Sequence, residues 1–506
     1  MALAVWEIAA IFLYGIFMLY IMAYSVSQFF LLIHFRKANK LKTSMSSPPS
    51  DWPRVVVQLP VYNEKYVVER LLEAVALLDY PKEKLHIQVL DDSTDETSAI
   101  IDRKALLVMA KGFQISVLRR QYREGYKAGA LAYGMQHCDA DFVAIFDADF
   151  VPKHDFLKRT IPQFDAPEVG MVQGRWAHLN RSQSRLTRFQ AFALDAHFTV
   201  EQSGRYYGGH FMNFNGTAGV WRRTCINDAG GWQADTLTED LDLSYRAQLR
   251  GWKFKFDIHT AVPAELPLTA SAVRSQQYRW IKGAAECAVK LLPKMLRSNV
   301  PFSTKYHAFF HLLNSMVFVA VFFTSLLSIP ILHILISHPE LKVYFAWGAV
   351  FLSATVVLAG YYHESVKAIG ETKPLRFVPE FVMFLAIVMA FSFHNTVAAL
   401  QGYFGKKTAF VRTPKYSLNA HEALSDKLAY HRIQKNFFPF AEIMLGAVFL
   451  MAAFFGIYFR EPGLVFYHLL LSVGYFVWGG FSIIQEWKLK RNFARAPQLS
   501  ISVQES

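Results

Sequence analysis

The stretch from Asp235 to Trp280 reads DTLTEDLDLSYRAQLRGWKFKFDIHTAVPAELPLTASAVRSQQYRW. Its first part is typical of a helix start: either Thr236 and Glu239 form a capping box, or Thr238 caps the helix directly. Apolar residues then recur at three- and four-residue spacing: Leu237, Leu241, Tyr245, Leu249 and Trp252. This spacing predicts a helix with one buried face and with Asp240 near its N-terminal tip.

The end of this stretch combines three kinds of side chain. Gln276, Arg279 and Trp280 supply an amide, a guanidinium and an indole close together. Arginine binds phosphate through parallel hydrogen bonds, and tryptophan offers a flat face to the apolar side of a sugar ring. The combination indicates a site for both a phosphate and a sugar, although either part alone is equally well explained by a capped core helix with scattered side chains.

Composition indicates a membrane protein with more than one structural unit. The chain has 506 residues, 53% of them apolar, with 44 Phe and 23 Tyr. This length exceeds one ordinary core, and this apolar content exceeds that of soluble proteins. The net charge of +13 is explained by Lys and Arg kept on cytoplasmic faces, so we expect no nucleic-acid partner. The cysteines, Cys138, Cys225 and Cys287, show no disulfide or metal spacing.

Long apolar runs flank a segment whose mixture of charged and apolar residues is typical of a soluble domain. In chain order we expect an N-terminal span with a basic flank, a linker, a soluble-type domain, an amphipathic interface helix, transmembrane spans with an interfacial helix, a cytoplasmic loop, C-terminal spans and a basic cytoplasmic tail. The corresponding ranges are 1–42, 43–53, 54–280, 281–300, 301–401, 402–436, 437–487 and 488–506. The expected spans are 5–33, 308–336, 343–362, 438–459 and 464–484.

One further apolar run, Phe381 to Leu400, is long enough to cross a bilayer. Crossing would place the basic loop 405–436 and the tail from Lys488 to Arg491 outside the cytoplasm, against the positive-inside rule. We therefore expect this run to lie at the interface, with five true spans and with the loop facing the soluble-type domain, while a crossing stays open as the alternative.

From Arg54 onward, short buried strands alternate with helical patterns. We expect strands over 55–59, 86–90, 115–118, 142–146 and 170–173, and helices over 66–78, 96–111, 127–137 and 155–164. This alternation predicts an α/β, Rossmann-like domain with a parallel sheet and helices on both faces. Ligands of such sheets bind beyond the carboxyl ends of the strands.

Carboxylates follow two of these strands directly. Asp91 and Asp92 come after the second strand, and the Asp147-Ala-Asp149 sequence comes after the fourth. An Asp-x-Asp pair at a strand end suits a hard divalent cation, Mg²⁺ or Mn²⁺, that bridges to a diphosphate. The glycine-flanked turn around Lys127 places an ammonium group at a helix start, which favours anions.

Seven segments together resemble the processive family 2 glycosyltransferases of the cellulose-synthase group, most closely its cellulose-synthase-like A and C branches, the glucomannan and xyloglucan-backbone synthases. They are QLPVYNE (58–64), QVLDDSTDET (88–97), GYKAGAL (125–131), AIFDADF (144–150), NFNGTAG (213–219), LTEDLDL (237–243) and QQYRW (276–280). The resemblance implies a GT-A type cytoplasmic glycosyltransferase domain joined to a polytopic α-helical transmembrane domain.

The resemblance also implies roles for single residues. The nucleotide sugar would be held by Tyr62, Glu64, Asp91, Asp92, Lys127, Asp147, Thr413 and Lys415. The metal would be held by Asp147 and Asp149, and the general base would be Asp240. The diphosphate and the terminal acceptor sugar would be bound by Gln276, Arg279 and Trp280. Thr413 and Lys415 belong to FVRTPK (410–415), which is similar to the gating loop of these synthases.

These inferences predict a membrane-embedded, inverting, processive β-glycosyltransferase that polymerises a hexose and translocates the growing polysaccharide. Its product would be a β-1,4-glucan or a mannan or glucomannan backbone. A single base without a second carboxylate nucleophile favours direct displacement, and Asp240 at a helix N-terminus is expected to stay ionised. The donor, UDP-glucose or GDP-mannose, the membrane, a bacterial inner or plasma membrane or a Golgi membrane, and any protein partners stay open.

Two other classes of protein compete with this interpretation. A single-addition lipid glycosyltransferase of the ceramide glucosyltransferase type shares the Gln-x-x-Arg-Trp pattern, but five spans and a gating-like loop favour chain extrusion. A transporter with a cytoplasmic regulatory domain usually needs ionisable residues deep in its spans. The expected spans hold few polar residues for such a site, Asn314 among them.

Overall fold

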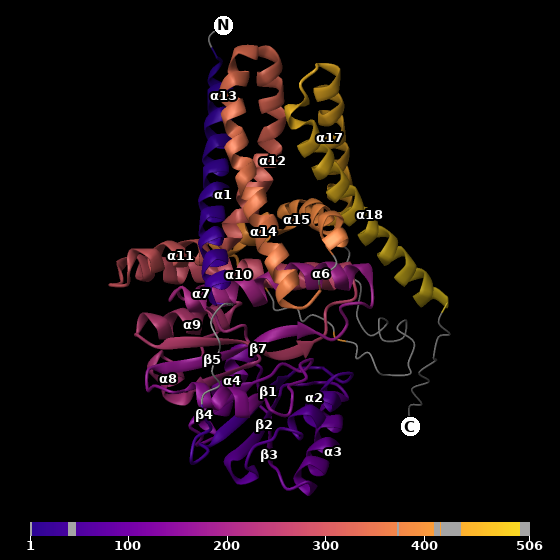
Figure 1. Ribbon diagram of the computed structural model, residues 1–506. Coiled ribbons are helices and arrows are strands. Elements are labelled where there is room, and N and C mark those ends of the chain that lie inside the picture. The colour runs from indigo at the N-terminus through magenta and orange to yellow at the C-terminus, as the bar shows by residue number, and fades with distance from the viewer. Residues whose placement is uncertain (1–2, 39–46, 372–373, 409–414, 416–436, 496–506) are drawn as a thin grey trace.

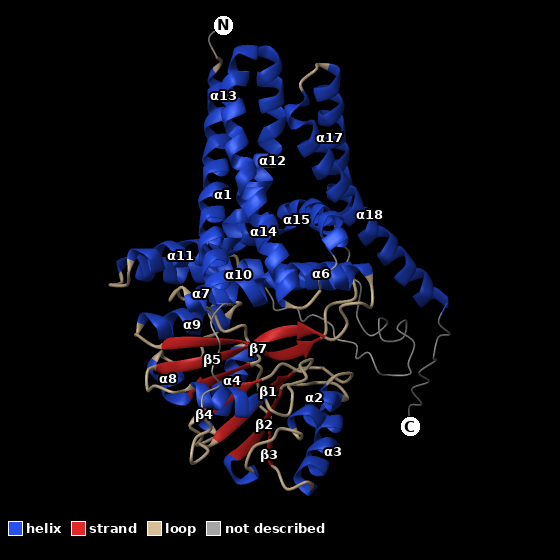
Figure 2. Cartoon of the chain, viewed as in Figure 1, coloured by secondary structure: helices blue, strands red, loops and turns tan. Residues whose placement is uncertain are grey.

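The computed structural model describes residues 3–38, 47–371, 374–408, 415 and 437–495. It consists of a lower unit that contains the sheet and an upper bundle of upright helices, with further helices lying across the junction (Figure 1). Figure 2 shows that the strands of the described residues are confined to the lower unit. The chain therefore divides into a soluble-type domain and a helical bundle, as its composition predicts.

The lower unit is built on one seven-stranded sheet in the order β3-β2-β1-β4-β6-β5-β7. The strands are β1 (Val55–Val61), β2 (Leu85–Asp91), β3 (Gln114–Leu118), β4 (Phe142–Ile145), β5 (Val169–His178), β6 (Gly219–Arg222) and β7 (Lys253–Ala264). The neighbouring pairs are parallel except those of β6, which runs antiparallel to β4 and β5. The five predicted strands are present, but the expectation of a wholly parallel sheet is wrong at β6.

Helices cover both faces of the sheet because its central strands are apolar on both sides. In β1, Val55 and Val57 belong to the core that includes α2 and α3, and Val56 belongs to the core that includes α4, α8 and α9. These helices are α2 (Val68–Val75), α3 (Thr97–Ala110), α4 (Tyr126–Gln136), α8 (Arg223–Asp228) and α9 (Glu239–Leu249). The alternation along one strand thus fixes which helices lie on which face.

The helix α9 begins where the sequence places it but is not capped as predicted. Thr238 makes no side-chain capping bond, and the buried Thr236 hydroxyl has no hydrogen-bond partner among the described residues, so both capping predictions are wrong. Instead the Leu237 amide donates to Glu286 Oε2 at 2.8 Å. A carboxylate of α10 (Ala270–Arg297) thus holds the residue before the N-cap of α9, so the position of the base-bearing helix start depends on a tertiary contact.

The helix α10 joins two segments that the sequence treats separately. It runs for 28 residues through the QQYRW segment and through the predicted amphipathic helix. Its first turn is capped by Thr269, whose side chain accepts a hydrogen bond from the Ala272 amide. One continuous helix therefore carries both the QQYRW segment and most of the predicted amphipathic segment.

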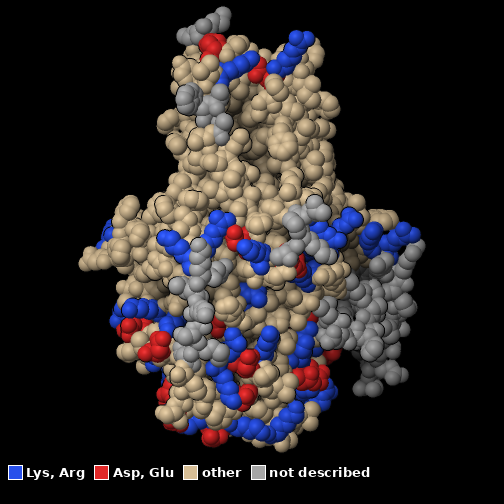
Figure 3. All heavy atoms as spheres, in the orientation of Figure 1, with Lys and Arg blue, Asp and Glu red and all other residues tan. Residues whose placement is uncertain are grey.

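Five described helices are long and apolar enough to cross a membrane: Val5–Ala38, Asn314–Ser337, Arg376–Tyr403, Phe438–Tyr458 and Pro462–Arg491. They lie in α1 (Val5–Ala38), α12 (Asn314–Ser337), α15 (Pro374–Tyr403), α17 (Phe438–Tyr458) and α18 (Val465–Arg495). On the face shown in Figure 3, a band of the upper bundle carries almost no Lys, Arg, Asp or Glu. The chain is a membrane protein.

The predicted span 343–362 is not one continuous α-helix. It is divided into α13 (Lys342–Trp347), a 3₁₀ turn (Gly348–Phe351) and α14 (Leu352–Ala368). Together α13 and α14 form an upright column beside α1 and α12 (Figure 1). The column has the position of a span, although neither helix alone reaches the length of one.

The ambiguous apolar run 381–400 lies within α15, at the base of the bundle just above α10 and α6 (Arg185–Ala196) (Figure 1). Ala398 and Ala399 pack against Ile281 of α10, and Phe381 and Phe384 pack with Phe192 of α6. α15 thus rests along its length on helices of the junction. This position fits the interfacial placement, which stays a prediction.

Candidate active site

Most of the predicted site residues meet in one cavity of about 220 Å³. The cavity lies beyond the carboxyl ends of β1, β2 and β4, which share one edge of the sheet because they are parallel. The predicted residues in its wall are Tyr62, Glu64, Asp92, Lys127, Asp147, Asp149, Asp240, Gln276, Arg279, Trp280 and Lys415. Asp91 does not line the cavity, and Thr413 lies outside the described residues.

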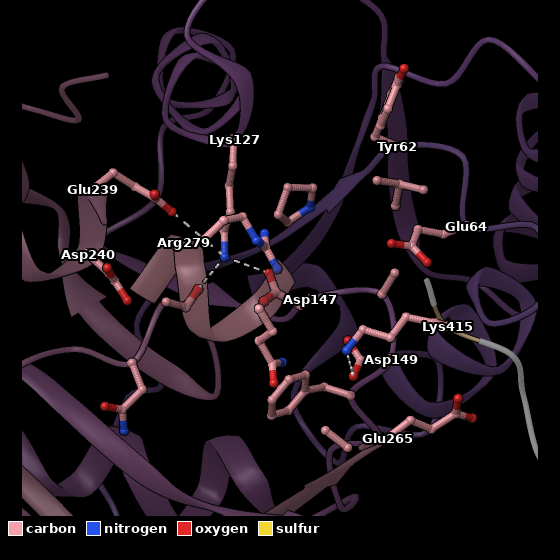
Figure 4. A pocket seen from close by; sticks show the side chains of 18 of the residues that line it. Tyr62, Glu64, Lys127, Asp147, Asp149, Glu239, Asp240, Glu265, Arg279 and Lys415 are labelled. Carbon is pink, nitrogen blue, oxygen red and sulfur yellow. Dashed lines mark hydrogen bonds and ion pairs between the residues drawn. The ribbon is translucent and has the colours of Figure 1, made fainter. Parts of the chain in front are cut away.

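Lys127 links three elements around the cavity (Figure 4). Its ammonium group donates to Asp147 Oδ1 at 2.6 Å and to the Gly216 carbonyl at 2.8 Å, and Glu239 Oε1 lies 3.9 Å away. Burial opposes the charge, but the Asp147 and Glu239 carboxylates outweigh it and raise the pKa of Lys127. A permanent cation therefore lies between the Asp-x-Asp pair and the start of α9.

Asp147 and Asp149 both reach the cavity, and each accepts a hydrogen bond from a lysine. Lys127 Nζ donates to Asp147 Oδ1, and Lys415 Nζ donates to Asp149 Oδ2 at 2.5 Å. Ammonium groups thus stand where a divalent cation with oxygen ligands would sit, and the donor set fits such an ion. Among the described residues, no group of three or more His, Cys, Asp and Glu side chains could hold a metal. The remaining ligands would therefore come from a diphosphate and from water.

Asp240 lies at the start of α9, across the cavity from Tyr62 (Figure 4). Burial raises its pKa to about 7, and the neighbouring Glu239 carboxylate adds to the rise. Desolvation therefore acts against the helix dipole at Asp240, and the expectation that this carboxyl group stays ionised remains a prediction. A carboxyl group with this pKa is well matched to take a proton from a hydroxyl.

Gly216 allows the two charged groups at the centre of the site to approach the backbone. Its φ is +78°, and a Cβ atom there would lie 3.1 Å from Asp240 Oδ2 and 3.4 Å from Lys127 Nζ. A side chain would meet both unfavourable backbone conformation and close contacts. The NFNGTAG segment therefore shapes the floor between Asp240 and Lys127.

Asp91 and Asp92 brace the loops behind the cavity. Asp91 is buried and accepts from Ser98 Oγ at 2.7 Å and from Arg119 Nε at 2.8 Å. Asp92 pairs with Arg120, which also donates to the Tyr126 carbonyl at 3.0 Å. Asp92 thus reaches the cavity and holds the turn before Lys127, while a nucleoside contact of Asp91 stays a prediction.

The site residues of α10 lie between the base-bearing loop and the membrane helices. A Cβ atom on Gly283 would lie 2.5 Å from Thr238 Cγ2, so α10 packs directly against the residue before α9. On the other side Tyr278 donates to Gln401 of α15. Trp280 therefore lines the cavity from a helix that also touches the base of the bundle.

Sequence reasoning missed several polar and aromatic residues of the cavity wall, among them Arg123, Trp176, His178 and Glu265. Arg123 lies two residues before the GYKAGAL segment, and its position beside this motif is the one feature of the sequence that could have pointed to the site. Trp176 and His178 lie at the end of β5, where an aromatic or histidine residue is indistinguishable in sequence from a core residue. Only the folded sheet shows that this strand end also reaches the site.

Comparison with known proteins gives matches over most of the chain. The profile of a family described as "Glycosyltransferase like family 2" matches residues 53–283. Glucomannan 4-beta-mannosyltransferase 7 of Arabidopsis thaliana is 36% identical over 453 residues, covering 88% of this chain and 79% of that protein. Glucomannan 4-beta-mannosyltransferase 1 of Cyamopsis tetragonoloba is 34% identical over 448 residues, covering 86% and 82%.

A solved structure shares the fold. The mannosyltransferase of Pyrobaculum calidifontis in complex with GDP-Man and Mn²⁺ superposes with a TM-score of 0.54 at 19% identity, covering 78% of this chain and 100% of that one. The matches confirm the resemblance and the Rossmann-like domain, and they favour a polysaccharide synthase over a lipid glycosyltransferase or a transporter. The chain therefore belongs to the processive family 2 glycosyltransferases of the cellulose-synthase group and is a membrane-embedded hexosyltransferase.

Proposed function

We propose that this enzyme polymerises mannose from GDP-mannose into the β-1,4-linked backbone of a mannan or glucomannan. The observation that carries the proposal is the single cavity shared by the Asp147 and Asp149 pair, Asp240 and Trp280. The choice of mannose over glucose is supported by the names of the relatives, and the choice of GDP by a mannosyltransferase of the same fold solved with GDP-Man.

The proposed chemistry assigns one task to each group of residues. A divalent cation bound by Asp147 and Asp149 would supply neutralisation of the leaving diphosphate. Lys127 and Arg279 add positive charge beside that diphosphate. Asp240 accepts the proton of the acceptor hydroxyl as its oxygen forms a bond to the anomeric carbon. The bond from that carbon to the diphosphate oxygen breaks on the opposite face, so an α-linked donor gives a β-linked product.

The acceptor end of the cavity lies toward the membrane helices. Trp280 offers a flat surface to the last sugar of the chain, and Gln276 offers an amide to its hydroxyls. Because Trp280 lies on α10, which also contacts α15, a chain that grows there extends toward the base of the bundle. This placement supports translocation of the product through the bundle.

The proposal also places the catalytic domain in the cytoplasm. Lys406 and Lys407 follow α15 on the catalytic side of the bundle, and α18 ends with Lys488, Lys490 and Arg491 on that side. Positive charge is retained on cytoplasmic faces. The donor and the catalytic cavity would then share one compartment.

The test is polymer synthesis by the purified full-length protein in detergent with radiolabelled GDP-mannose or UDP-glucose and Mn²⁺ or Mg²⁺. GDP-mannose is expected to give a high-molecular-weight product that β-1,4-mannanase degrades, and EDTA is expected to stop its synthesis. Asp240→Asn is expected to bind donor but to incorporate about 100-fold less sugar or lower. A product degraded only by β-glucanase, or one sugar attached to a lipid, would contradict the proposal.

A further inference from the structure

Arg123 is a preorganised planar group in the wall of the cavity. Its guanidinium carbon lies 3.5 Å from the centre of the Tyr62 ring and 4.9 Å from the centre of the Tyr126 ring. Stacking on two aromatic rings fixes the plane of a guanidinium, and Arg123 Nε lies 3.9 Å from Asp92 Oδ2, which anchors the same group from the side of the turn. Little ordering is then needed when a ligand arrives.

The turn that carries Arg123 is held rigidly from behind. Arg120 donates to the Glu124 carbonyl at 2.7 Å and to the Tyr126 carbonyl at 3.0 Å, and it pairs with Asp92. Tyr126 itself has a φ of +48°, which is uncommon for a residue with a side chain. Such a conformation persists only where its surroundings impose it, and it occurs at binding sites.

The order of groups along the cavity identifies which part of a donor would meet Arg123. In Figure 4, Asp240 and Tyr62 lie at opposite sides, with Lys127 and Asp147 between them. With the sugar near Asp240 and the diphosphate near Lys127 and Asp147, the base lies near Tyr62 and therefore near Arg123. The end of the cavity around Tyr62 is thus the end that meets the nucleobase.

We propose that Arg123 recognises the guanine of the donor and selects it over uracil; this inference rests on the proposed GDP-mannose donor. A guanidinium has only donors, arranged as a fork. Guanine offers two neighbouring acceptors, O6 and N7, and arginine binds them together. Uracil has no such pair, because its O4 is flanked by a C–H group and by the N3–H donor. Arg123 is therefore a specificity-determining residue at the base end of the cavity.

The test compares nucleotides by equilibrium binding to the full-length protein in detergent with Mn²⁺. GDP is compared with 7-deaza-GDP, in which carbon replaces N7, with IDP, which keeps O6 and N7, and with UDP. The variant Arg123→Lys keeps the charge but removes the fork. Arg103→Lys is the matched control, because Arg103 is exposed on α3 and does not line the cavity.

The wild-type protein is expected to bind 7-deaza-GDP about tenfold more weakly than GDP, as loss of one arm of a bidentate contact implies. In Arg123→Lys, the binding of GDP and of IDP is expected to weaken to the level of 7-deaza-GDP binding, while Arg103→Lys is expected to bind all four nucleotides as the wild type does. Equal binding of GDP and 7-deaza-GDP by the wild type, or an unchanged preference in Arg123→Lys, overturns the role of Arg123 alone. Binding of UDP without GDP overturns the proposed donor as well.

Discussion

At the scale of single residues, the reaction depends on the neighbouring carboxyl groups of Glu239 and Asp240. Burial raises the pKa of both, and the charge of Glu239 raises the pKa of Asp240 further, to about 7. A base must be ionised to accept a proton, so kcat/KM is expected to rise as the pH increases through about 7. Glu239→Gln removes the repulsion, lowers the pKa of Asp240 and should move the rise to lower pH. A profile that stays in place or moves to higher pH would contradict the assignment of Asp240.

A second residue-scale prediction separates backbone strain from the crowding of the site. Gly216 and Gly231 have φ values of +78° and +70°, but a Cβ atom on Gly216 meets Asp240 and Lys127, whereas one on Gly231 meets nothing within 4 Å. Alanine at either position is expected to cost about 1–2 kcal/mol of unfolding free energy. Only Gly216→Ala should also lower kcat, by about tenfold or more, because it displaces the base. Equal kcat values in the two variants would show that Gly216 does not shape the site.

At the scale of elements, α10 is held in place by a buried ion pair with α17 and by further contacts with α18. Arg274 pairs with Glu442 of α17, donates to Ser482 of α18 at 2.9 Å and stacks on Trp478 with its guanidinium carbon 4.9 Å from the ring centre. Arg274 lies on the same helix as Gln276 and close to it in sequence. The hairpin of α17 and α18 therefore fixes the helix that carries the acceptor residues.

Removing one partner leaves a buried charge unpaired, so Arg274→Met or Glu442→Gln is expected to cost about 3–5 kcal/mol. The double variant Arg274→Met/Glu442→Leu should recover part of this loss. Arg36→Met, which breaks the more exposed pair with Glu364, should cost about 1 kcal/mol or less. Thermal unfolding in detergent measures the order of stability of these four variants. A double variant as unstable as the worse single variant would argue against the pairing.

The elements show where sequence patterns suffice and where they fail. β1 to β5 follow from apolar runs bounded by turns, and the carboxylates after β2 and β4 predict the edge that carries the site. β4 and β6 both have four residues, but β4 is wholly apolar, whereas β6 places Val220 and Trp221 between a glycine and an arginine, so β6 forms no apolar run that predicts a strand. β7 contains a Lys-Phe-Lys-Phe alternation, which is a strand signal, and this signal begins directly after Trp252, the last residue of the predicted helix pattern. The start of α9 is held through the Leu237 amide by Glu286, far along the chain, and local capping rules do not predict such a contact.

The same limit applies to the site. The Asp-x-Asp pair, Lys127, Asp240 and the residues of α10 follow from motifs, because their chemistry is visible as residue type and spacing. The raised pKa of Asp240 depends on burial that only packing determines. Arg123 and His178 reach the cavity through the course of a turn and of a strand end, which residue type does not reveal.

At the scale of the whole molecule, the proposed topology can be tested from both sides of the membrane. Phe404 follows α15 and is 83% exposed, whereas Arg460 is exposed in the turn between α17 and α18 at the far end of the bundle (Figure 1). On intact cells that carry the protein in the plasma membrane, and in a Cys138→Ser background that removes the half-exposed native thiol, an impermeant maleimide is expected to label Arg460→Cys and to label Phe404→Cys only after permeabilisation. The reverse pattern would mean that α15 crosses the membrane.

The account claims above all that one cavity holds the donor and the acceptor together. The most direct measurement is a cryo-electron microscopy structure of the full-length Asp240→Asn protein with GDP-mannose and Mn²⁺. It should show the diphosphate at Asp147 and Asp149, the mannose facing position 240 and the guanine beside Tyr62. Nucleotide density away from this cavity, or a sugar turned away from position 240 and from Trp280, would contradict the account.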